Sequence, residues 1–385
     1  MAVKSRFEYI NIIGYNVDAI EESQLEAFHD NLKYADLILT VAEGRSRYKL
    51  NIACSEMAKM DNGKSIIDRR DTGFPGRNLN EALPKLLDKY DDILILINSG
   101  SGKSTVPLIA AQELEKYKEN CDNDDIKINL ITSNPHSPIG EIASKYGTTL
   151  ELKGRETVTG INDEDIRRAG GFMGDLFELG SAELLFLENE LLYRDWPFDR
   201  FYDIHEKYYP KMIDCVDKYT SSEEFNFLIN EASARHMLLF AGLGSGHDVA
   251  RTTNVRMGHV KKAVGDNTYA AGESGTPSAR RGDILIPILE NEQQVDRTIA
   301  EWCAQHLKLE GNIVSIAESD DLETVKLSDY SIILKQDRPR QAPNRFFLEA
   351  AYVLSPLPLL LIEKFDSIGL KIPPQLMEFY HAYTG

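Results

Sequence analysis

The order of apolar and amphipathic segments constrains the fold of this chain more than any other feature. Short apolar stretches, ADLILTV (35–41), DDILILI (91–97) and IKINLIT (126–132), are typical of buried strands. A stretch with helical periodicity around residues 19–32 precedes the first of them, and two more, around 48–59 and 79–89, lie between the first and the second. Strands separated by helices form βαβ units, in which the strands pair in parallel and helices cover both faces of the sheet. The first half of the chain therefore predicts an α/β fold.

The same order of elements recurs in the second half. The strand, glycine turn and helix of ADLILTVAEGRSRYKLN (35–51) have a counterpart in RHMLLFAGLGSGHDVARTTN (235–254), and DDILILI has one in GDILIPI (282–288). A long apolar helix is expected to close each half, at 172–192 and at 344–365.

This repetition indicates a diverged tandem duplication. The spacing between matched segments falls from roughly 200 residues to roughly 170 along the chain, so the second copy has lost loop length. We expect two domains, residues 1–197 and 198–385.

Charge and cysteine usage exclude several classes of function. The formal net charge of −18 repels a polyphosphate backbone, so we expect no nucleic-acid partner. The four cysteines form no CxxC pair, which argues against a disulfide framework or a zinc site and favours a reducing, cytoplasmic location. No cluster of His, Asp or Glu has metal-ligand spacing, so we expect no metal and no cofactor.

We also expect no membrane association. The first 16 residues lack the long apolar core of a signal peptide. The most apolar stretch, 352–362, is short for a bilayer span and contains two prolines. It is interpreted as one buried helix or as two short pieces.

A loop of small residues, SGSGKST (99–105), follows the apolar strand 93–98. In a nucleotide-binding P-loop the first glycine makes the turn after the strand, but that position is Ile97, inside the strand. The loop instead suits a phosphomonoester, which would bind to inward-facing amides, serine hydroxyls and the N-terminus of a helix starting near Ser104. The alternative is a serine-rich helix cap without a ligand. The candidate phosphate-binding residues are Ser99, Gly100, Ser101, Gly102, Ser104 and Thr105.

The motifs together resemble the SIS (sugar isomerase) family, especially its 3-hexulose-6-phosphate isomerase-like branch. The resemblance rests on GRSR (44–47), DTGFP (71–75), SGSGKST, FMGDLFELGSAELLFLE (172–188), GLGSGHD (242–248), GESGTP (272–277) and FFLEAA (346–351). It implies two tandem three-layer αβα sandwich domains, each with a five-stranded parallel, flavodoxin-like sheet. It also implies that the serine loop holds the phosphate of a small-molecule sugar phosphate.

Further candidate substrate-binding residues lie in the first glycine turn. Gly44, Arg45 and Ser46 follow the first strand, at the sheet edge where parallel sheets bind ligands. Arg45 and Arg47 can equally pair with acidic neighbours on this acidic chain.

Two features depart from the family pattern. Lys103 stands where the family has an acidic or amide residue, and it either attracts the anion or is a solvated lysine at the helix start. In the second half the loop reads IPILENEQQ (286–294), with acidic side chains and no serine or glycine. We therefore expect the conventional phosphate pocket in the first domain only.

Isomerisation of an aldose to a ketose needs a base that moves a proton through an enediol, and a donor that stabilises the oxyanion. The resemblance implies that Glu178 is the base, with Glu349 as its counterpart in the second half. The branch also has a histidine on the helix after the first glycine turn, and the first half lacks one. We hypothesise that the second domain supplies it through His259 or His247. The candidate catalytic residues are Glu178, His259 and Lys103.

These features favour a phosphosugar isomerase that acts through an enediol. The alternatives are a phosphosugar-binding protein without activity and a deglycase that cleaves a sugar–amine phosphate. Relatives in the family commonly dimerise or tetramerise, and the apolar closing helices suit such an interface, so we expect a homodimer or a higher homo-oligomer.

Overall fold

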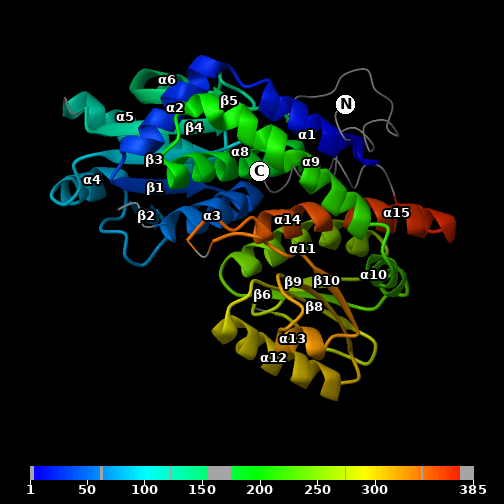
Figure 1. The fold of residues 1–385 in the computed structure, drawn as a ribbon. Helices are drawn as coiled ribbons and strands as arrows, with labels where there is room; N and C mark the ends of the chain where they lie inside the picture. The colour runs from blue at the N-terminus through cyan, green and yellow to red at the C-terminus, as the bar shows by residue number, and fades with distance from the viewer. Residues whose placement is uncertain are drawn as a thin grey trace.

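The chain forms two α/β domains, one from each half of the sequence (Figure 1). The computed structural model describes residues 4–60, 64–121, 124–154, 175–273, 275–339 and 341–372. Each domain contains a five-stranded sheet with parallel pairing throughout. The strand orders are β2-β1-β3-β4-β5 and β10-β9-β8-β6-β7, which are the same order read from opposite edges. The two predicted sheets and the tandem arrangement are confirmed.

The first sheet is covered by helices on both faces. Helices α4, α5 and α6 pack on one face, and α1, α2, α3 and α8 lie on the other. The strands are β1 (Leu37–Ala42), β2 (Ser65–Asp68), β3 (Ile93–Asn98), β4 (Ile126–Thr132) and β5 (Gly147–Glu151). The helices are α1 (Glu8–Asp18), α2 (Glu22–Tyr34), α3 (Gly44–Ala58), α4 (Leu79–Leu87), α5 (Thr105–Asn120), α6 (Pro138–Tyr146) and α8 (Asp175–Arg194).

The second sheet repeats this arrangement after a connecting turn, η1 (Phe198–Arg200). Its outer face packs against α12 and α13, and its inner face against α10, α11, α14 and α15. The strands are β6 (Leu238–Gly242), β7 (Thr268–Ala270), β8 (Ile284–Leu289), β9 (Asn312–Ala317) and β10 (Tyr330–Ile333). The helices are α9 (Phe201–Tyr219), α10 (Glu223–Ser233), α11 (Ser245–Ala263), α12 (Gln293–Lys308), α13 (Glu323–Lys326), α14 (Phe346–Leu354) and α15 (Leu357–Ser367).

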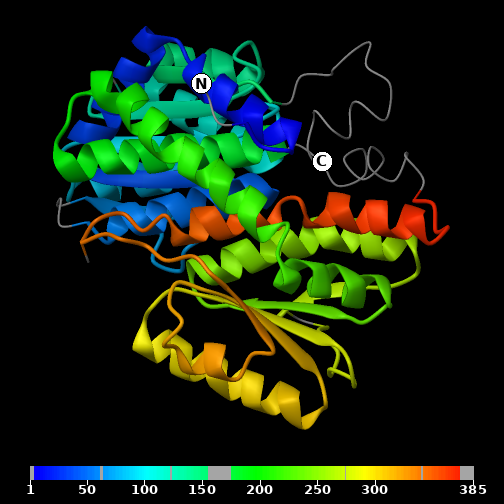
Figure 2. The ribbon, with the colours of Figure 1, turned by 45° about the vertical axis from the view of Figure 1, so that its right-hand side comes forward.

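One hydrophobic core runs through both domains. Helices α3 and α11 pack against each other, and α14 contacts both α8 and α9. Figure 2 shows this helical layer between the two sheets. The apolar faces of α8, α14 and α15 are therefore covered within the chain, so the closing helices do not offer the open interface that the sequence suggested.

The second closing helix, expected over 344–365, is interrupted, and its apolar stretch 352–362 belongs to two shorter helices, which is one of the two interpretations that the sequence left open. It is broken into α14 and α15 at Ser355 and Pro356, because a proline ring cannot donate a backbone hydrogen bond. Phe346–Ser367 is long and apolar enough to cross a membrane, but most of it is buried inside the protein, as a core helix would be. The start of the first closing helix, before Asp175, lies outside the described residues.

Candidate active site

The serine loop connects β3 to α5 at the carboxyl edge of the first sheet, as predicted. Its path requires a glycine at position 102. Gly102 has φ +63°, and a Cβ there would stand 1.9 Å from Ser137 Oγ. Ser137 itself caps α6 by accepting the amide of Gly140 at 3.1 Å. The loop is thus seated tightly on the turn that follows β4.

Backbone amides of this loop are available for an anion. The amides of Gly100, Ser101, Ser104 and Thr105 have no hydrogen-bond partner in the described parts of the chain. The Gly102 amide donates instead to the Ser99 carbonyl at 3.0 Å. Several amides at the start of a long helix are therefore free to bind an anion, as phosphate binding requires.

One acidic side chain reaches the same helix end. Glu43 Oε2 accepts a hydrogen bond from the Val106 amide at 3.3 Å. Lys103 is exposed, and its amide donates to the Ser101 hydroxyl at 3.2 Å. Glu43 was not singled out from the sequence, and its place directly before the Gly44 turn is the signal that could have identified it.

The candidate base lies next to the first glycine turn. The Ser46 hydroxyl donates to Glu178 Oε1 at 3.1 Å, and both residues are buried. Asn98, the last residue of β3, donates to the Ser46 carbonyl at 3.3 Å and to the Ser181 hydroxyl at 3.0 Å. The structure thus joins the glycine turn, the closing helix and the base of the serine loop, which are far apart in sequence.

Gly44 and Arg45 have different roles in this arrangement. Gly44 has φ +59°, and a Cβ there would meet no atom of the described residues within 4 Å. The Arg45 guanidinium is buried, with Nη1 3.6 Å from Asp175 Oδ1, and Arg47 Nε donates to Asp68 at 2.9 Å. Both arginines therefore have acidic neighbours, which was the alternative interpretation of the sequence.

A buried cluster of charges lies beneath the candidate site. Arg256 of α11 forms an ion pair with Asp175, and both side chains are fully buried. The Lys49 ammonium is also fully buried and has no hydrogen-bond partner among the described residues. Burial, together with the nearby Arg256 charge, holds the pKa of Lys49 well below its usual range. The sequence did not point to Lys49 or Arg256, although Lys49 lies one helical turn from Arg45.

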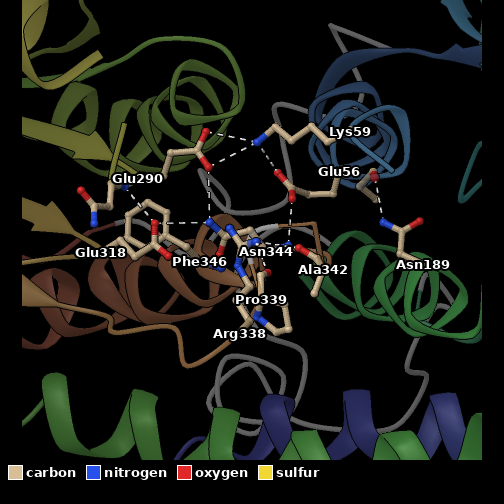
Figure 3. Close-up of polar contacts among 12 residues, drawn as sticks. Glu56, Lys59, Asn189, Glu290, Glu318, Arg338, Pro339, Ala342, Asn344 and Phe346 are labelled. Atoms are coloured by element: carbon tan, nitrogen blue, oxygen red, sulfur yellow. Dashed lines mark hydrogen bonds and ion pairs between the residues drawn. The ribbon is translucent and has the colours of Figure 1, made fainter. Parts of the chain in front are cut away.

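In the second domain an acidic residue stands where the serine loop begins in the first. Glu290 follows β8 at the position that Ser99 occupies after β3, and Lys59 of the first domain donates to it at 3.1 Å (Figure 3). Lys59 also donates to Glu56 at 2.8 Å, and Glu56 accepts the Asn344 amide at 2.8 Å. The acidic loop therefore contributes to an interdomain hydrogen-bond network.

Glu349, the counterpart of Glu178, also forms a hydrogen bond within the protein. It accepts a hydrogen bond from Gln336 at 2.7 Å. Burial raises the pKa of Glu349 to about 7.

The two candidate histidines lie at different places on α11. His247 is in the first turn, lines a cavity between the domains, and has its pKa lowered by burial. His259 lies almost a full turn after Arg256 and is half-buried.

Solved structures match this chain over almost its whole length. A Silicibacter pomeroyi protein described as a candidate phosphosugar isomerase has a TM-score of 0.61 at 14% identity, covering 96% of this chain and 100% of its own. The C-terminal domain of glucosamine-fructose-6-phosphate aminotransferase from Francisella tularensis has a TM-score of 0.59 at 14% identity, covering 94% of both chains. Tagatose-6-phosphate ketose/aldose isomerase from Escherichia coli has a TM-score of 0.55 at 15% identity, covering 92% of this chain and 90% of its own.

The chain has the tandem SIS-domain fold. No protein-family model matches the sequence, and no curated protein matches it significantly. The similarity to these solved structures is therefore visible in the fold, whereas the sequences are only 14–15% identical. Within the fold, the first SIS domain has the open serine loop, and the second uses the corresponding position to bind the first domain.

Proposed function

We propose that this protein is a sugar-phosphate isomerase with one active site, in the first SIS domain. The observation that carries the proposal is the contact between Ser46 and Glu178, 3.1 Å apart, beside a serine loop with unoccupied amides. The loop would bind the phosphate, and Glu178 would transfer a proton between adjacent sugar carbons. A carboxylate held by a hydroxyl near a phosphate anchor suits enediol chemistry.

The matched positions of the two domains support His259 as a further catalytic group, because the corresponding helices α3 and α11 pack against each other. Gly44 and Gly244 both have positive φ at the turn where their helices start, and Lys59 and His259 follow these glycines by the same number of residues. Lys59 reaches Glu290, the counterpart of Ser99. By the same relation His259 would reach the serine loop of the first domain.

The partners of Arg256 and of its counterpart in the first domain are consistent with this matching of positions. That counterpart is Glu56, which accepts the amide of Asn344 just before α14, and Arg256 pairs with Asp175 at the start of the described part of α8. His247, at the other end of α11, would not reach the first-domain site. We propose His259 as the acid–base partner of Glu178, and exposed Lys103 as a cation that attracts the phosphate.

The test is proton exchange and turnover in D₂O with a panel of pentose 5-phosphates, hexose 6-phosphates and hexosamine 6-phosphates. Wild-type protein should incorporate deuterium at C1 or C2 of one substrate. Glu178→Gln should reduce exchange by at least about a hundredfold, because general base catalysis contributes factors of that order. His259→Ala should lower the rate by about tenfold or more, with Glu141→Gln and His236→Ala as surface and second-domain controls.

Binding separates the isomerase from a protein that only binds sugar phosphates. A ligand should raise the melting temperature of wild type and of Glu178→Gln alike, because the phosphate anchor remains. Stabilisation without any proton exchange would establish the binding function and refute catalysis. Absence of both would refute a sugar-phosphate site.

The assembly and location are proposals of the same kind. We propose a homo-oligomer, to be measured by light scattering, although α8 and α14 are occupied within one chain. We also propose a cytoplasmic location, since all four cysteines are free.

A further inference from the structure

A second cavity, separate from the serine loop, lies between the two domains. Its volume is about 650 Å³. Helix α3 and the segment after β2 form one wall, and the β6–α11 turn with Trp302 of α12 forms the other. None of the residues Ser99 to Thr105 lines it. The cavity therefore does not belong to the proposed isomerase site.

The glycines of the second wall leave room for a ligand. Gly244 and Gly272 have φ +53° and +86°, and a Cβ at either would meet no atom within 4 Å in the parts of the chain that the structure describes. Two amides of the helix start behind them are engaged within the turn. The Gly246 amide donates to the Leu243 carbonyl at 3.0 Å, and the His247 amide to the Gly244 carbonyl at 3.0 Å.

The charges of the cavity also disfavour an anion. Arg47, the one arginine among the described residues that line it, is paired with Asp68 at 2.9 Å. Asp71 and Asp248 add two more carboxylates, one from each domain. Burial raises the pKa of Asp248 to about 6, and the nearby Asn51 side chain opposes this in part. Among the described residues, no group of three or more His, Cys, Asp or Glu is arranged to hold a metal ion.

We propose that this interdomain cavity binds a hydroxylated primary amine, such as an amino sugar that carries no phosphate. Asp71 and Asp248, which line the cavity from different domains, would share the ammonium group, and Asp71 Oδ2 also accepts the Asp68 amide at 3.1 Å. Thr40, Asn51 and Ser55 supply hydrogen bonds for hydroxyl groups, and Trp302 supplies apolar surface for the carbon face of a ring.

Isothermal titration calorimetry of the full chain with three probes tests separately whether the amine and the hydroxyl groups are needed for binding. Glucosamine carries both groups, glucose has the hydroxyls without the amine, and putrescine has amines without hydroxyls. Glucosamine should bind with a Kd below about 1 mM and at least about tenfold more tightly than either other probe. Equal binding of glucose or putrescine would overturn the proposal, as would no glucosamine binding at all.

Two variants locate the site. Asp248→Asn keeps the size of the side chain and should weaken glucosamine binding by about tenfold, because it removes one charge. Asp199→Asn, an exposed change of the same charge, should leave the Kd unchanged. Glu178→Gln in the first domain should also leave it unchanged, so binding here is tested independently of isomerase activity. Loss of binding in Glu178→Gln but not in Asp248→Asn would assign the amine to the other site and refute the proposal.

Discussion

The charge state of Lys49 depends strongly on the residues around it. A lysine with no exposed surface and no hydrogen-bond partner among the described residues is costly to ionise, and the neighbouring arginines Arg45 and Arg256 add to that cost. Asp175 and Glu178 oppose it only in part. A neutral amine beneath a candidate base is the arrangement that burial favours here.

This predicts how stability changes with pH in Lys49→Met. The pKa of Lys49 is lower in the folded protein than in the unfolded chain, where it is about 10.4. Between those values the unfolded state binds the extra proton, so wild-type stability rises with pH and is lost as pH falls towards the folded pKa. Lys49→Met removes this dependence and should be more stable than wild type at pH 7, with the difference shrinking towards pH 10.

Urea unfolding between pH 6 and pH 10 measures this effect. Lys116→Met, an exposed lysine on α5, is the control and should follow wild type across the range. A Lys49→Met protein that is less stable than wild type at pH 7 would show that the buried ammonium is charged and stabilising.

At the scale of elements, two glycines with the same backbone conformation differ in what surrounds them. Gly44 and Gly102 both have positive φ, but only at Gly102 would a Cβ collide with a neighbouring element. A Cβ at Gly44 would meet no atom of the described residues within 4 Å, whereas the Gly102 loop is fitted against Ser137 and α6.

Alanine at these two positions should therefore have unequal effects. Gly44→Ala should cost about 1–2 kcal/mol of unfolding free energy, from the left-handed conformation alone. Gly102→Ala should cost more, because the serine loop must move away from α6, and it should also abolish stabilisation by a sugar phosphate. Denaturant unfolding and ligand melting shifts measure the two properties, and equal stability of both variants would contradict the predicted collision.

At the scale of the whole molecule, the two domains are joined by buried charges as well as by apolar packing. Arg345, just before α14, donates to both oxygens of Glu183 on α8 at 2.7 and 2.8 Å, and Glu183 has no exposed surface. The core that contains α8, α11 and α14 is continuous across the domain boundary. Unfolding one domain would expose the inner face of the other.

We therefore expect a single cooperative thermal transition in calorimetry. Arg345→Met should destabilise the whole chain by about 3–5 kcal/mol, because it leaves the Glu183 carboxylate buried without its partner. Lys335→Met, which breaks an exposed ion pair with Asp320, should cost less than about 1 kcal/mol. Two resolved transitions, with only one shifted in Arg345→Met, would show that the domains unfold independently.

The sequence by itself determined the two parallel sheets, their tandem order and the serine loop after β3. These follow from local information: apolar runs of strand length, helical periodicity, and glycines and serines at strand ends. It also indicated that the loop after β8 cannot hold a phosphate, because Glu290 stands where Ser99 stands in the first copy.

Only the tertiary structure decided which charges meet. Lys49, Asp175 and Arg256 are ordinary helix residues in sequence, and their burial in one cluster depends on how α3, α8 and α11 pack. The same holds for the interdomain cavity, whose walls come from residues about 200 positions apart. Periodicity fixes which face of a helix is buried, but the partner of that face, and hence the electrostatics between them, is set by long-range packing.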